Sequence, residues 1–172
     1  MKWLASSTFS SSLLLRYCPQ NVIPPVAQRY LGSPFHPIRP KIAHMHATRD
    51  PNTLWWRASV APIGDLKRVV RSWCARKARL ALQQALRNHG FDDLGRPLSD
   101  FPVPQKYNLT GSLEVIVRPN GVGQSFETFR DDADHLLGHI LRLRSAHLER
   151  ASKNPAKNLK SGKPSKKSKS KS

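Results

Sequence analysis

The sequence has few acidic residues, few cysteines and no long apolar run. Of its 172 residues, 29 are Lys or Arg and 11 are Asp or Glu, and none of the acids lies in residues 1–49 or 151–172. Cys18 and Cys74 are the only cysteines, which excludes a small secreted domain built on disulfides. No stretch approaches the roughly 20 consecutive apolar residues of a transmembrane helix, so the sequence predicts no membrane span.

The basic residues divide the chain into three parts. Residues 1–49 hold six basic residues, residues 50–150 have a net charge of only +4, and residues 151–172 hold eight lysines. This distribution predicts one nearly balanced folded segment between two basic extensions. The total length suits one ordinary domain, since domains commonly have about 100–150 residues.

The N-terminal extension has the composition of a targeting segment. Residues 1–32 are rich in serine and leucine, contain Arg16 and Arg29, and lack acids, which is typical of mitochondrial presequences. We therefore predict the mitochondrial matrix as the location, with a processing site near residues 30–32. Two alternatives stay open: a secretory signal with an apolar region over Trp3–Leu15, and a disordered tail that carries no address.

Prolines punctuate the segment that follows. Because proline lacks an N–H donor and fixes φ, their density predicts irregular, extended backbone over residues 19–51. The chain is then expected to have a Pro-rich linker over residues 33–52, and its folded domain is expected to begin near Thr53. The prolines concerned are Pro19, Pro24, Pro25, Pro34, Pro37, Pro40 and Pro51.

Residues 53–150 predict a small α+β domain in the order strand, helix, strand, helix. The strands are expected over 53–60 and 109–117, and the helices over 65–89, opened by Asp65, and onward from Ser125. A sheet of two strands is marginal by itself. We therefore expect either a third strand within residues 101–107 or ribonucleoprotein partners that complete the core.

Both expected helices have a periodic pattern. In the helix over 65–89, one sector is expected to face the core, and it contains Leu66, Val69, Val70, Trp73, Leu80 and Ala81. The opposite half carries Arg68, Arg71, Arg76, Arg79 and Arg87. The second helix has an apolar stripe of Phe126, Phe129, Ala133, Leu136, Leu137, Ile140, Leu141 and Leu148.

The arginine-bearing helix is the strongest candidate for binding RNA. Arginine side chains and aromatic rings are the groups that grip single-stranded or structured RNA, and Trp55 and Trp56 are expected nearby. The predicted contacts in the folded domain are Arg57, Lys67, Arg68, Arg71, Arg76 and Arg79.

The C-terminal extension, residues 151–172, is expected to be a disordered polycation, because it has too few apolar residues to form a core. Flexible lysines bind phosphates in a salt-dependent, sequence-tolerant way. A nuclear localisation signal or a solubilising tail are the alternatives. The predicted contacts here are Lys160, Lys163, Lys166, Lys167, Lys169 and Lys171.

Three further patterns are weak candidates for chemistry. Asp131, His135 and His139 share a helical face, but the glutamate of the H-E-x-x-H zinc motif is missing, so we predict neither a metal nor another cofactor. Cys74 is interpreted as a buried hydrophobe rather than as a nucleophile. The segment 121–124 (Gly-Val-Gly-Gln) is interpreted as a plain turn, although it resembles the Gly-Gly-Gln loop of peptidyl-tRNA-hydrolysing release factors.

The sequence as a whole predicts a non-catalytic, RNA-binding protein of the mitochondrial matrix, associated with the ribosome or its assembly. The resemblance at residues 121–124 implies a first alternative, a small tRNA-linked ester hydrolase. The lysine-rich tail supports a second alternative, a basic nucleic-acid-binding accessory protein of the nucleus or nucleolus.

Overall fold

A four-stranded mixed sheet organises the chain. The computed structural model describes residues 6–62, 66–99 and 108–153, and its strands are β1 (Ser6–Phe9), β2 (Leu13–Cys18), β3 (Leu54–Val60) and β4 (Gly111–Val117). Their order across the sheet is β1-β2-β4-β3. β2 lies antiparallel to both β1 and β4, whereas β3 runs parallel to β4. The protein is therefore an α+β fold, as the sequence predicts.

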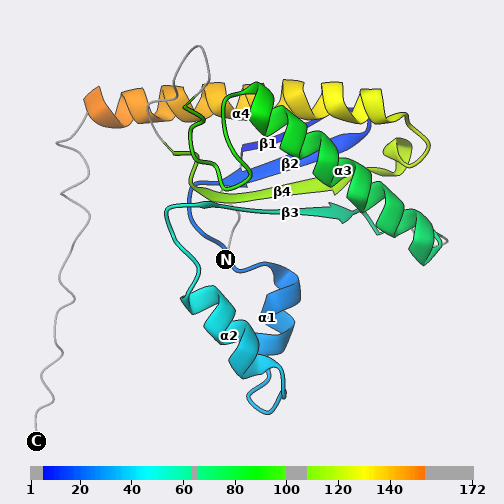
Figure 1. Ribbon diagram of the computed structural model, residues 1–172, viewed down its shortest axis with the longest axis vertical. Coiled ribbons are helices and arrows are strands. Elements are labelled where there is room, and N and C mark those ends of the chain that lie inside the picture. The colour runs from blue at the N-terminus through cyan, green and yellow to red at the C-terminus, as the bar shows by residue number, and fades with distance from the viewer. Residues whose placement is uncertain (1–5, 63–65, 100–107, 154–172) are drawn as a thin grey trace, which may run out of the picture.

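Helices lie on both sides of this sheet (Figure 1). The long helices α3 (Arg68–Asn88) and α4 (Phe126–Lys153) pack against each other and cover one face. The short helices α1 (Pro25–Gly32) and α2 (Arg39–Ala47) lie on the other side, and the 3-10 turn η1 (Pro119–Gly121) follows β4. Within the described residues, no helix is long and apolar enough to cross a membrane.

The order expected for residues 53–150 is confirmed as β3, α3, β4 and α4. The Ser125 hydroxyl caps α4 by accepting a hydrogen bond from the Thr128 amide at 3.2 Å. α3 begins at Arg68 with Lys67 in the N-cap position, three residues later than predicted. Asp65, the segment 101–107 and the predicted RNA contacts of the C-terminal tail lie outside the described residues, whereas Lys153 is the last residue of α4.

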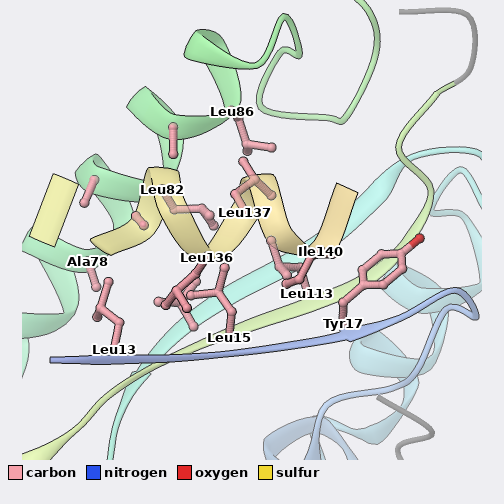
Figure 2. Close-up of a cluster of buried hydrophobic side chains, with 14 of the residues drawn as sticks. Leu13, Leu15, Tyr17, Ala78, Leu82, Leu86, Leu113, Leu136, Leu137 and Ile140 are labelled. Carbon is pink, nitrogen blue, oxygen red and sulfur yellow. The ribbon is translucent and has the colours of Figure 1, made fainter. Parts of the chain in front are cut away.

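The expectation that the folded domain begins near Thr53 is wrong, because residues 6–18 supply half of the strands. Leu13, Leu15 and Tyr17 alternate along β2 and point into the core beneath α4 (Figure 2). They pair in register with Val117, Val115 and Leu113 of β4. The core is thus completed by the N-terminal segment of the same chain, whereas the sequence analysis expected residues 101–107 or a partner.

The serines between β1 and β2 have a structural role, whereas the sequence analysis interpreted the serine-rich N-terminus as a targeting segment. The Ser10 hydroxyl donates a hydrogen bond to Asp132 Oδ2 at 2.7 Å, and the Ser12 hydroxyl donates to the same oxygen. Arg118 Nη1 donates to the Ser10 carbonyl at 2.6 Å. These contacts fasten the β1–β2 turn to α4 and to the end of β4.

The prediction of irregular backbone over residues 19–51 is also wrong, since α1 and α2 lie there. Pro25 is the first residue of α1 and Pro40 the second residue of α2. In the first turn of a helix, proline's missing N–H has no intrahelical partner to lose, and its φ already suits the helix. The prolines therefore begin these helices rather than prevent them.

The buried face of α3 agrees only in part with the predicted one: Ala81 is buried and Val70 packs against the core as predicted. Val69, Trp73 and Leu80 are 78%, 50% and 52% exposed, although the sequence pattern assigned them to the core. The residues that face the core are smaller on average and let α3 lie close to α4 and β3: Cys74, Ala78, Ala81, Leu82, Ala85 and Leu86. In α4 the predicted stripe is buried from Phe129 to Ile140, Phe126 is 38% exposed, and the side chain of Leu148 is not described.

We predict that Leu15→Ala lowers the free energy of unfolding by about 2–5 kcal/mol, because it leaves a cavity under α4. Leu14→Ala is the matched control: Leu14 is on the same strand but faces away from α3 and α4 and is only half-buried. Urea unfolding measures both, and the control is expected to cost less than half as much. Equal costs would contradict the placement of β2 in the core.

Candidate nucleic-acid interface

The outward face of α3 combines positive charge with exposed apolar side chains. The helix carries six basic residues and no acid along its 21 residues. Arg68, Arg76 and Arg79 are exposed, and none of the ion pairs among the described residues involves them. The rise of 1.5 Å per residue spreads these arginines over about 16 Å of helix. Lys67 and Arg71 are exposed at the N-terminal end of the same helix.

Two shallow hollows lie on this face, each of about 330 Å³. Ser72 and Arg76 line both of them, so the hollows are neighbours on the helix surface. The first extends toward β3 and is also lined by Val60, Ala75, Arg71 and Arg79. The second is also lined by Arg68, Val69 and Trp73. Each hollow therefore places arginine guanidinium groups beside apolar surface, which suits the phosphates and the bases of a nucleic acid.

Trp73 is supported from beneath by a buried lysine. The Lys77 Nζ lies 4.1 Å from the centroid of the Trp73 ring and 4.7 Å from that of Phe129. Lys77 itself is 8% exposed, and its ammonium donates a hydrogen bond to the Gln124 carbonyl. A cation over an aromatic face is attractive, so Lys77 holds the ring in place. Half of the Trp73 surface remains exposed for a stacking contact.

Arg57 does not join the arginines of α3. It pairs with Glu114, and Arg16 Nη1 lies 3.9 Å from the other oxygen of the same carboxylate. Arg16, Glu114 and Arg57 form one row across β2, β4 and β3, on the sheet face opposite α3. Since β3 alternates, Trp55 also lies on that opposite face, whereas Trp56 packs against the core and donates its Nε1–H to the Asp93 carbonyl at 2.8 Å. The predicted site residues thus fall on two faces.

The loop over residues 121–124 is explained by packing. Gly121 is buried, and a Cβ there would come within 2.6 Å of the Ser12 carbonyl oxygen. The Gln124 amide donates to the Gly121 carbonyl at 3.2 Å, which closes a tight turn. Gly121 is therefore needed for the close approach of the β1–β2 turn. The hydrolase reading that rests on this loop stays a prediction.

A third hollow, of about 390 Å³, lies between α4 and the end of α3. His89 and His135 both line it, with Asp131 and Asp134. His89 Nε2 lies 3.5 Å from Asp134 Oδ1, while His139 is exposed on the same helix. In the described part of the chain, no three His, Cys, Asp or Glu residues are grouped so that they could hold a metal ion.

Cys74 is fully buried between α3 and the loop after β4. Its Sγ lies 3.8 Å from the Val122 carbonyl. Burial raises the pKa of the Cys74 thiol, and the nearby positive charge of Lys77 offsets this only in part. A thiol that is both inaccessible and protonated is a poor nucleophile.

Comparison with known proteins adds little to this description. No protein-family model matches the chain, and no curated protein matches it. The solved structure of the RNase P protein from Staphylococcus aureus is similar over 78% of this chain and 79% of that one, with 12% sequence identity and a TM-score of 0.39. A likeness at that level establishes neither a family nor an activity for this chain.

We predict that iodoacetamide alkylates Cys74 in the folded Cys18→Ala variant much more slowly than in the same variant unfolded in urea. Because burial raises the thiol pKa, the thiolate population at pH 7 is smaller than that of a free cysteine, and the rate should continue to rise above pH 9. Mass spectrometry after timed quenching measures both rates. Equal rates at pH 7 would mean that Cys74 is accessible and activated.

Proposed function

We propose that this protein binds RNA without catalysis, through the outward face of α3. The observation that carries the proposal is the exposure of Arg68, Arg76 and Arg79 on a helix without any acid, where Arg68 and Arg76 line the same hollow as the half-exposed Trp73. Guanidinium groups neutralise phosphates, and an exposed indole stacks on bases whatever their identity. A face of this composition favours RNA with accessible, unpaired bases.

The C-terminal lysines extend this interface beyond the folded domain. Residues 151–172 add eight positive charges and no negative one. A polycationic segment strengthens binding to any phosphate backbone through counterion release and does not select a sequence. In this proposal α3 provides the oriented contacts and the tail provides general, salt-sensitive affinity.

The cellular setting that we propose is the mitochondrial matrix, where the protein would associate with the ribosome or its assembly intermediates. The acid-free, serine-rich N-terminus supports the address, and the net charge of +18 suits a place within a large polyanion. A cut near residues 30–32 would remove β1 and β2 from the sheet. We therefore propose that the segment containing these strands is retained after import.

The RNA interface is tested by the triple variant Arg68→Gln, Arg76→Gln, Arg79→Gln with a labelled single-stranded RNA. Each phosphate contact to a single strand contributes about 0.7 to the slope of log Kobs against log salt concentration. The variant should therefore lower the magnitude of that slope by about 2 and weaken binding at low salt. Fluorescence anisotropy across a salt series measures both quantities.

A second triple variant, Arg96→Gln, Arg130→Gln, Arg142→Gln, is the matched control. It removes the same charge from exposed or partly exposed arginines that have carboxylate or carbonyl partners elsewhere in the fold. Its slope should stay close to that of the unaltered protein. If both variants lost the same amount of slope and affinity, binding would depend on net charge alone. That result would contradict a defined site on α3.

We predict that the full-length, C-terminally tagged protein sediments with a mitochondrial ribosomal subunit at low salt and leaves it at high salt. Its mature N-terminus, read by mass spectrometry, should lie at or before Ser6, because β1 begins there. Free migration after mild lysis would contradict the ribosomal association. A nuclear location that depends on residues 151–172 would instead support the nuclear alternative, and a mature start near residue 32 would contradict retention of β1 and β2.

A further inference from the structure

The hairpin formed by α1 and α2 projects from the sheet on the side away from α4 (Figure 1). Hydrogen bonds fasten its two ends, and its C-terminal part also contacts β3: the His46 ring lies 5.7 Å from the Trp55 ring, and the Arg49 guanidinium lies 4.7 Å from it. Asn21 Nδ2 donates a hydrogen bond to the Pro51 carbonyl at 2.7 Å, which joins the two ends of the hairpin. The Val22 amide donates to Ser112 Oγ at 2.7 Å, and Trp55 Nε1 donates to the Asp50 carbonyl at 3.1 Å. The two helices pack mainly against each other.

Little of this hairpin is buried. Ala27 is the one buried residue of α1, and α2 has none. Helices of eight and nine residues gain too little from their own hydrogen bonds to be stable alone in water, and most helices depend on packing an apolar face. The hairpin therefore lacks the packing that stabilises helices of this length elsewhere in proteins.

The hairpin does have apolar side chains that could pack against another surface, but they are exposed. Four large apolar side chains of this segment lie open to solvent: Val26 (56%), Phe35 (94%), Ile38 (46%) and Met45 (55%). Phe35 lies in the turn between the helices, and that turn is ordered around it. The Tyr30 and His36 rings meet edge to face at 4.9 Å, and Arg39 Nε donates to the Leu31 carbonyl at 3.3 Å. Phe35 takes no part in these contacts, and its side chain is the most exposed of the four.

The charge on the two helices and on the turn between them has one sign, and the single acid of the segment, Asp50 at its base, lies 3.7 Å from Arg96. Arg29, Arg39, Lys41 and Arg49 are all exposed, and residues 1–49 contain no acid. A surface that docks here therefore has to supply the negative charge as well as the apolar contact. Charges of this kind at the rim of an interface favour complementary partners and speed their encounter.

We propose that the α1–α2 hairpin is a docking arm for a protein partner that offers an apolar pocket for Phe35 within an acidic rim. Aliphatic side chains such as Val26, Ile38 and Met45 gain from contact with an apolar protein surface, whereas nucleic acids bind through phosphate contacts and flat ring stacking. Aromatic residues, phenylalanine among them, are enriched in the cores of protein interfaces, where a few side chains in desolvated pockets carry most of the binding energy. This inference goes beyond RNA binding, because the hairpin and α3 lie on opposite sides of the sheet.

The first step of the test places a photo-reactive benzoylphenylalanine at position 35 of the full-length chain and irradiates living cells. A nuclease-resistant conjugate with one protein is expected, and mass spectrometry identifies that protein. Position 9 carries the same probe as control, because Phe9 is also an exposed phenylalanine, on β1. A nuclease-sensitive conjugate, a conjugate with only a second copy of this chain, or no conjugate at position 35 would overturn the proposal.

The second step uses the identified partner after purification. Phe35→Ala should weaken its binding about tenfold or more, which is the effect expected of an interface anchor. Arg29→Gln with Lys41→Gln, two exposed positions, should lower the association rate and its dependence on salt. Phe9→Ala should bind as the unaltered protein does. All variants should keep the circular dichroism spectrum and the urea midpoint of the unaltered protein, which shows that they fold. Unchanged binding by Phe35→Ala would also overturn the proposal.

Discussion

The pairing of β2 with β4 is the contact on which the rest of the structure depends. It joins residues 13–18 to residues 112–117, segments that are about a hundred residues apart in the chain. The register places Leu13, Leu15 and Tyr17 of β2 on the face that α4 covers, and it gives β1 an inner strand to pair with. Without it, β3 and β4 would form a two-stranded sheet, which is marginal in water.

The composition of the α3–α4 contact decides which side chains reach the surface. Cys74, Ala78, Ala81 and Ala85 are small, so α3 can approach α4 and the sheet closely. The larger side chains Val69, Trp73 and Leu80 are then left on the outside, among the arginines. The mixed cationic and apolar face that we propose as the RNA interface is thus a consequence of how the helix packs. The sequence pattern alone predicted that its apolar residues would face the core.

Two exposed surfaces result, and they differ in character. The α3 face is rich in arginine and has one large aromatic ring, whereas the α1–α2 hairpin is richer in aliphatic side chains and has a single protruding phenylalanine. The sheet lies between them. Across its middle, Arg16 and Arg57 form ion pairs with the buried Glu114. The two surfaces for which we propose ligands therefore lie on opposite sides of the sheet.

The sequence by itself determined the local elements whose periodicity and caps are strong. The order β3, α3, β4, α4, the Ser125 cap and the buried stripe from Phe129 to Ile140 followed from spacing and capping rules, because those signals are local. The arginines of α3 were also predicted to be exposed. Only the tertiary structure decided that residues 6–18 form strands. Their serine-rich composition is typical of a targeting segment, and the alternation of Leu13, Leu15 and Tyr17 is short. The strand with which they pair, β4, is also far away in the chain. The same holds for the separation of Arg57 from α3, because the face to which a strand residue points is fixed by its register and not by its neighbours in sequence.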